Sequence, residues 1–135
     1  MPESAFRQHA GWQAGWQDAP MPPDRILFLD GEAIVIDKPA GLAVHPGPRT
    51  PDSLERHLPA LRFGFHRPPQ PAHRIDRDTS GCLLLARNPK ALKRFAEAFA
   101  AGAVAKLYWA VLDGLPAEPA GVVDLPLAKV SSREA

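Results

Sequence analysis

Two short aliphatic runs on either side of an Asp-Gly pair constrain the fold of this chain most. The runs cover residues 25–29 (RILFL) and 33–37 (AIVID), and Asp30, Gly31 and Glu32 lie between them. Aliphatic and β-branched residues favour strands, and an Asp-Gly pair favours the tight turn of a hairpin. The pattern therefore predicts two antiparallel strands.

A short helix and a buried strand are predicted downstream of this hairpin. Thr50, with Pro51 behind it, has the features of a helix N-cap and a first-turn proline, and the helix is expected to end at Leu58. Residues 82–86 (CLLLA) form an apolar run of strand length. We expect this run to be a buried strand in which Cys82 is a small core residue.

A longer helix and two more strands complete the predicted elements. Asn88 and Pro89 open the helix and Gly102 ends it. Its apolar stripe consists of Leu92, Phe95, Ala96 and Phe99. The side chains of residues 104–112 alternate between two faces, which predicts a strand. A last strand is predicted at residues 122–127. One face of the strand at residues 104–112 is expected to pack and consists of Leu107, Trp109 and Val111. The other face consists of Lys106, Tyr108 and Ala110. This order predicts an α+β fold with a mixed, mainly antiparallel sheet and flanking helices.

The composition is that of one soluble globular domain. Of the 135 residues, 45% are apolar and 23% are charged, which excludes a disordered tail and a membrane protein. Residues 1–17 hold no apolar run of signal-peptide length, and no stretch approaches the roughly 20 apolar residues of a membrane span. A single cysteine favours a reducing compartment, so we expect the protein in the cytoplasm. We also expect it to be a monomer.

Residues 1–23 are rich in Gln, Ala, Pro and Gly and have no sustained periodicity. They are predicted to form a loosely ordered arm, in which Trp12 and Trp16 could dock as one helical turn. Residues 24–135 are then the folded domain.

Charge is distributed unevenly along the chain. The formal net charge is +1, but residues 1–55 carry −4, residues 56–106 carry +7 and residues 107–135 carry −2. Clustered Lys and Arg supply sequence-independent affinity for phosphates, so the basic middle third is a candidate nucleic-acid surface. Taken alone, it is more often a solvated charged face.

The segment HRIDRDTSG, residues 73–81, carries the candidate chemistry. Asp76 lies between Arg74 and Arg77, and neighbouring arginines favour the ionised form of a carboxylate that acts as nucleophile or base. The alternative is that the segment has no catalytic role: Asp78 to Gly81 form a turn, and the Arg and Asp side chains are solvated ion pairs at the surface. Spacing alone favours this alternative.

This segment resembles the active-site motif of the RluA-type RNA pseudouridine synthases. Two further runs occur in the family's order: IVIDKPAGLAVHPGP, residues 34–48, and KLYWAVLDG, residues 106–114. The three runs together are far more specific than any one of them, and His73 places the chain in the histidine-led branch of the family. The resemblance implies a pseudouridine synthase-like catalytic domain.

The resemblance also implies roles for individual residues. Asp76 matches the catalytic aspartate, and Arg74 matches the arginine that replaces the flipped uridine in the RNA stack. Tyr108 matches the tyrosine that stacks on the target base and helps to move its C5 proton. Lys106 matches a basic residue beside it, and His73 and Arg77 are expected to contact RNA as well.

The implied reaction isomerises uridine in ribosomal or transfer RNA. It cleaves the bond from C1′ to N1 and rejoins the base through C5, so it resembles glycosidic chemistry without a water acceptor. Three routes remain open for Asp76: attack on the sugar, attack on the ring, or removal of the C2′ proton to give a glycal. No redox, energy or metal cofactor is needed, and His45, His57, His66 and His73 do not have a metal-ligand spacing.

The family's catalytic domain continues through a Thr-Gly-Arg and a His-Gln-Ile-Arg segment, and residues 115–135 match neither. We therefore expect residues 24–135 to be part of a longer catalytic domain. The alternative is a truncated relative that binds RNA without catalysis.

Overall fold

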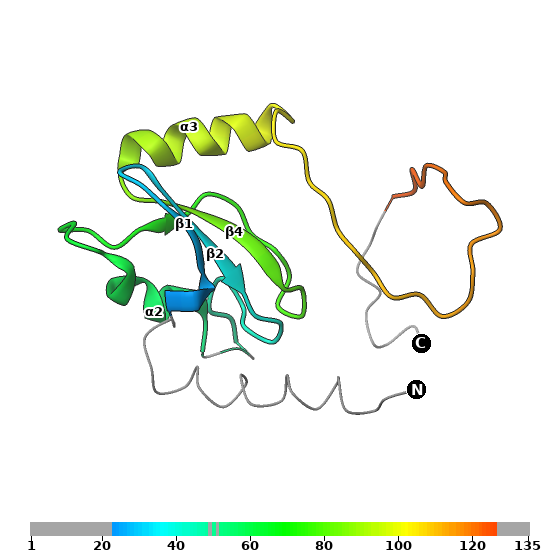
Figure 1. Cartoon of the computed structure of the whole chain (residues 1–135), viewed down its shortest axis with the longest axis horizontal. Helices are drawn as coiled ribbons and strands as arrows, with labels where there is room; N and C mark the ends of the chain where they lie inside the picture. Colours follow the sequence, from blue (N-terminus) through cyan, green and yellow to red (C-terminus); the bar gives the residue numbers. More distant parts are fainter. Residues whose placement is uncertain (1–22, 49, 51, 127–135) are drawn as a thin grey trace. The chain divides into compact units, whose positions relative to one another are not determined.

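The computed structural model describes residues 23–48, 50 and 52–126. The chain divides after Ala105 into two units, which are described separately. All helices and strands of the described residues lie in the first unit (Figure 1). The predicted arm, with Trp12 and Trp16, lies outside the described residues, except for Pro23.

The predicted hairpin is confirmed. Strands β1 (Ile26–Leu29) and β2 (Ala33–Lys38) are antiparallel. In the turn, the Asp30 carboxylate accepts hydrogen bonds from the backbone N–H groups of Glu32 and Ala33, at 2.8 and 2.7 Å. These two bonds lower the pKa of Asp30, because they stabilise the ionised carboxylate.

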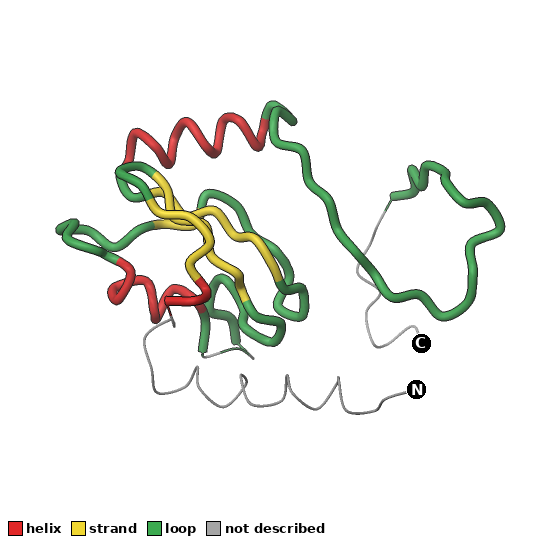
Figure 2. The backbone as a smooth tube through the Cα atoms, in the orientation of Figure 1, coloured by secondary structure: helices red, strands yellow, loops and turns green. Residues whose placement is uncertain are grey.

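The sheet has four strands in the order β1-β2-β4-β3. Figure 2 shows the strands in yellow. Strand β4 (Gly81–Ala86) runs antiparallel to β2, with Ala33 opposite Ala86 and Lys38 opposite Gly81. The two-residue strand β3 (Gln70–Pro71) pairs with the end of β4. It lies at the sheet edge, where the missing N–H of a proline is tolerated. The predicted α+β class with an antiparallel sheet is confirmed.

One face of the sheet packs on the core. Ile34 and Leu85 are opposite each other in neighbouring strands, as are Ile36 and Leu83, and all four are fully buried. The core residues that cover this face come from the loop after β2, from the helical residues 54–61 and from the segment before β4: Leu42, Val44, Leu54, Leu58, Leu61 and Ile75. Cys82 was predicted to be a core residue, but it is exposed. Side chains alternate along β4, so Cys82 lies on the face opposite Leu83 and Leu85.

Helix α3 (Pro89–Ala100) confirms the longer predicted helix and contacts β4. The Asn88 side chain accepts a hydrogen bond from the Ala91 N–H at 2.8 Å, as an N-cap does. Gly102 follows the helix with a φ of 67°, a left-handed conformation that glycine adopts easily.

The shorter predicted helix begins later than expected. Helix α2 spans Leu54–His57 and continues as the 3₁₀ helix η3 (Leu58–Leu61), while the 3₁₀ helix η2 (Pro23–Arg25) precedes β1. Thr50 is not the N-cap, because its backbone exchanges hydrogen bonds with Gly47 at 3.0 and 3.2 Å. The Leu54 N–H instead donates to the Ala43 carbonyl at 2.8 Å, which satisfies the helix start.

The strands predicted at residues 104–112 and 122–127 are not present in the described residues. Residues 105–126 carry no helix or strand, and residue 127 lies outside the described part. Leu107, Trp109 and Val111, expected to pack, are exposed. A strand forms only where its backbone pairs with a neighbour, and within the described residues this segment pairs with none. No helix of the described residues has the length and apolarity to cross a membrane.

Candidate active site

The segment HRIDRDTSG connects β3 to β4 and holds Asp76 at the surface. Ile75 is buried in the core, whereas Arg74 and Asp76 on either side of it are exposed. The Thr79 N–H donates to the Asp76 carbonyl at 3.1 Å, which closes a turn directly after the aspartate. Ile75 is therefore an anchor that leaves both charged neighbours accessible to a ligand.

His73 is part of the structural support of this segment. The Leu84 N–H donates to its Nε2 at 3.0 Å, so Nε2 acts as an acceptor in this contact. The ring also stacks on Phe99 of α3, with centroids 4.4 Å apart. His73 thus joins the start of the segment to β4 and to α3.

Lys38, which sequence reasoning did not single out, is the buried centre of the site. Its side chain is fully buried, and its ammonium donates to the carbonyls of Pro39, Leu42 and Arg77 at 2.8, 2.7 and 3.1 Å. All three protons of the ammonium therefore have an acceptor. The signal in the sequence was a lysine at the end of an apolar strand, directly before the Pro-Ala-Gly break.

Burial lowers the pKa of Lys38 from 10.5 to about 8, because the charged form loses its hydration. The carboxylates of Asp78 and Asp76 act in the opposite direction and raise it. Asp76 is thus an exposed carboxylate in the field of a buried cation.

Arg77 also connects the loop that follows β2 with the segment 73–81. Its Nε donates to the Gly41 carbonyl at 3.2 Å, and the Gly41 N–H donates back to the Arg77 carbonyl at 2.8 Å. Its contact with Asp78, at 3.9 Å, is exposed and contributes little. Arg77 therefore holds the loop that follows β2 against the segment that carries Asp76.

The structure brings four of the six predicted site residues together in one segment: His73, Arg74, Asp76 and Arg77. Lys106 and Tyr108 belong to the second unit, where both are exposed. Arg74 extends from the segment without a hydrogen bond or ion pair to a described residue, and its exposed guanidinium is available to a ligand.

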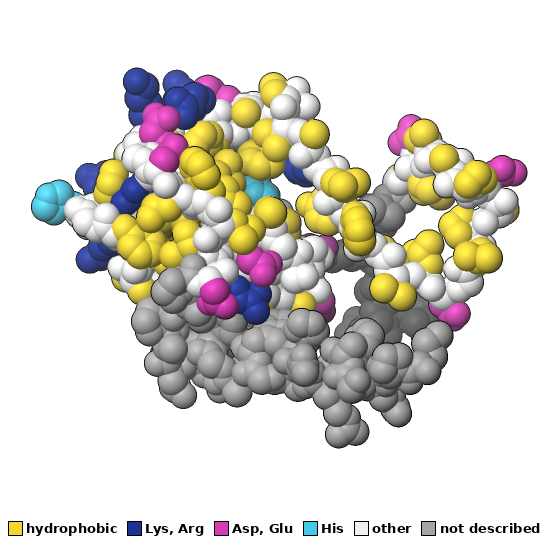
Figure 3. Space-filling view, in the orientation of Figure 1, with side chains coloured by type: hydrophobic (Ala, Val, Ile, Leu, Met, Phe, Trp, Pro, Cys, Tyr) yellow, Lys and Arg dark blue, Asp and Glu magenta, His cyan; other side chains and the backbone are white. Residues whose placement is uncertain are grey.

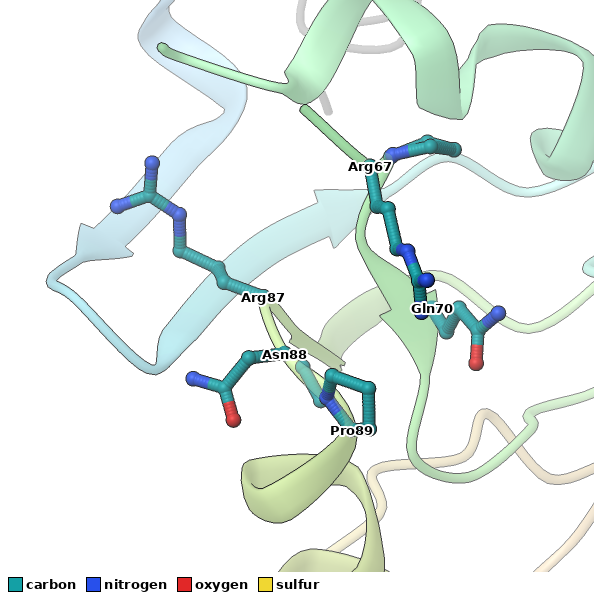
Figure 4. A pocket seen from close by; sticks show the side chains of 7 residues that line it. Arg67, Gln70, Arg87, Asn88 and Pro89 are labelled. Carbon is teal, nitrogen blue, oxygen red and sulfur yellow. The ribbon is translucent and has the colours of Figure 1, made fainter. Parts of the chain in front are cut away.

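A small cavity lies at the opposite end of β4. It measures about 50 Å³ and is lined by residues of two stretches, 67–70 and 86–89 (Figure 4). Asp76 is not among these residues, so the cavity is separate from the candidate site. Within residues 23–48, 50 and 52–126, no group of three His, Cys, Asp or Glu residues could hold a metal ion.

Comparison with known proteins decides the family. The family model described as RNA pseudouridylate synthase matches residues 32–135. The chain belongs to the RNA pseudouridylate synthase family. An uncharacterized RNA pseudouridine synthase of Zymomonas mobilis is 56% identical over 113 residues, which cover 84% of this chain and 52% of the relative. The mitochondrial pseudouridylate synthase RPUSD4 of Xenopus tropicalis is 40% identical over 76% of this chain and 33% of its own length.

A solved structure of the same family supports the fold. Human RNA pseudouridylate synthase domain containing 4 aligns with a TM-score of 0.51 and 30% identity, over 58% of this chain and 30% of that one. The predicted family resemblance is confirmed. The chain spans about half the length of its pseudouridine synthase relative from Zymomonas mobilis and a third of the one from Xenopus tropicalis.

Proposed function

We propose that the protein isomerises specific uridines of ribosomal or transfer RNA to pseudouridine, with Asp76 as the catalytic carboxylate. The observation that carries the proposal is the exposed Asp76 on a turn that the buried ammonium of Lys38 ties to the loop after β2. The family supports RNA as substrate, and the class of RNA is our proposal.

Reaching C1′ requires the uridine to leave the base stack, which costs a few kcal/mol and favours uridines in loops or distorted stems. The exposed Arg74 would fill the vacated position in the stack and offset part of that cost. Tyr108 would stack on the detached uracil, which contributes roughly 1–3 kcal/mol, and take part in moving the C5 proton. His73, Arg77 and Lys106 would support RNA binding around these residues.

The reaction breaks the C1′–N1 bond, forms a C1′–C5 bond and transfers the C5 proton to solvent, while N1 gains a proton. Three roles stay open for Asp76: attack on C1′, attack on the ring, or removal of the C2′ proton. A monomer in the cytoplasm remains our proposed state, although the RPUSD4 relatives are named as mitochondrial.

Release of tritium from RNA labelled at uridine C5 tests the proposal. The parent chain is expected to release tritium into water, and Asp76→Asn is expected to release none. Asp78→Asn is the matched control, since Asp78 is an exposed carboxylate of the same turn. RNA binding by the parent without release would replace this proposal by the non-catalytic, RNA-binding alternative.

A further inference from the structure

The loop between η3 and β3 interleaves aromatic and basic residues. Its sequence, Arg62 to Arg67, is RFGFHR. Phe63 and Phe65 are 45% and 37% exposed, and Arg62, His66 and Arg67 are exposed as well. Two partly exposed rings therefore alternate with basic side chains within six residues.

The backbone of this loop is held in a strained conformation. Phe63 has a φ of 44°, and among the described residues it is the one non-glycine residue with a positive φ. Such a conformation persists only where the surroundings enforce it, and it is often found at binding sites. Here it presents an aromatic ring to solvent.

Buried Arg87 enforces this conformation. Its guanidinium donates to the carbonyls of Arg62 and Phe63, at 3.2 and 3.0 Å, and to the carbonyl of Asp30. It also lies 3.9 Å from the centroid of the Phe65 ring. Arg87 therefore holds the backbone of the loop, while the Phe63 ring remains partly exposed to solvent.

We propose that this loop, residues 62–67, binds a single-stranded segment of RNA by stacking an unpaired base on Phe63. The inference rests on the proposed function, since it assigns a second contact with the same RNA. Base stacking on aromatic rings tolerates any sequence, and neighbouring cations attract the phosphates.

Charge favours RNA over a protein as the partner. Neither Arg62 nor Arg67 forms an ion pair with a carboxylate of the described residues, so both charges remain for phosphates. Arg67 extends along Gln70 at the edge of the cavity, whereas Arg87 points away from it (Figure 4). Lys and Arg side chains lie beside hydrophobic ones on this side of the molecule (Figure 3).

The position of the loop relative to Asp76 suits one RNA that contacts both. Arg87 and the loop lie at the Ala86 end of β4, and the segment with Asp76 leads into the Gly81 end. Six residues of strand separate these ends by about 17 Å. The loop would therefore bind nucleotides that flank the target uridine.

Binding of two fluorescein-labelled 12-nucleotide RNAs to the full chain, measured by anisotropy, tests the inference. One strand carries bases and the other is abasic at its central positions. Phe63→Asn removes the ring and keeps a residue that tolerates a positive φ, so the loop is preserved. We expect this variant to bind the base-bearing strand about tenfold more weakly and the abasic strand unchanged. Arg67→Gln is expected to weaken both.

Phe28→Thr is the matched control, because Phe28 is a similarly exposed phenylalanine, at 51%, on strand β1. The inference is overturned if Phe63→Asn binds the base-bearing strand as the parent does, or loses equal affinity for both strands. It is also overturned if Phe28→Thr loses as much. Asp76→Asn separates the two proposals, since it would abolish tritium release and leave this binding intact.

Discussion

The ammonium of Lys38 donates a hydrogen bond to the backbone carbonyl of Arg77, 39 positions further along the chain, at 3.1 Å. This contact joins the end of β2 to the residue directly after Asp76. A cation with no exposed surface thus positions a carboxylate that is exposed.

Replacing Lys38 by methionine is expected to destabilise the fold by about 2 kcal/mol. Three carbonyls lose a charged donor, and relief from burying the ammonium offsets part of that loss. Urea unfolding should show a lower midpoint with an unchanged slope. Lys93→Met is the control, because Lys93 is exposed on α3, and its effect should stay within about 0.5 kcal/mol. Equal midpoints for the two variants would contradict the role of Lys38.

Lys38 is also expected to make stability depend on pH. Its pKa is about 8 in the folded chain and 10.5 in the unfolded one, so between these values the unfolded state binds more protons. Its contribution therefore rises as pH increases from 8 to 10.5, by at most about 3 kcal/mol. Unfolding of the parent against Lys38→Met across this range isolates it, and a flat difference would contradict the low pKa.

Replacing Arg87 by methionine is expected to cost about 2–4 kcal/mol. The change removes a buried guanidinium and leaves the carbonyls of Asp30, Arg62 and Phe63 without their charged donor. Arg94→Gln is the comparison, because its bond to Glu32 at 2.6 Å is exposed and should be worth about 0.5–1 kcal/mol. Thermal unfolding at low and high salt distinguishes them, since only the Arg94 contribution should fall as salt rises. A smaller loss for Arg87→Met than for Arg94→Gln would be inconsistent with its buried position.

Ile75 is expected to link stability to activity. Ile75→Ala should lower the free energy of unfolding by about 2–4 kcal/mol, and Ile75→Val by about 0.5–1.5 kcal/mol, because the side chain is buried in the core. Tritium release should fall with Ile75→Ala at temperatures where the variant is still folded, since Asp76 loses its anchor. Full release by folded Ile75→Ala would show that Ile75 serves stability alone.

Local patterns predicted much of the first unit. The Asp-Gly turn between β1 and β2 and the Asn88 cap of α3 depend on residues within a few positions of each other, so the sequence contains the whole interaction. The candidate site was predicted from the resemblance of three sequence runs to one family. That resemblance singled out Asp76 as the candidate catalytic residue, whereas the spacing of residues 73–81 alone favoured a surface turn.

What the sequence by itself determined is therefore the hairpin, the main helix, the family and the segment that carries Asp76. Only the tertiary structure decided the rest: Lys38 under the site, Arg87 under the 62–67 loop, Thr50 in a turn instead of a cap, and residues 104–112 without a strand. The physical reason is the range of the interactions. A buried cation or a strand is defined by partners distant in sequence, and neither hydropathy nor periodicity specifies which carbonyl or which edge those partners provide.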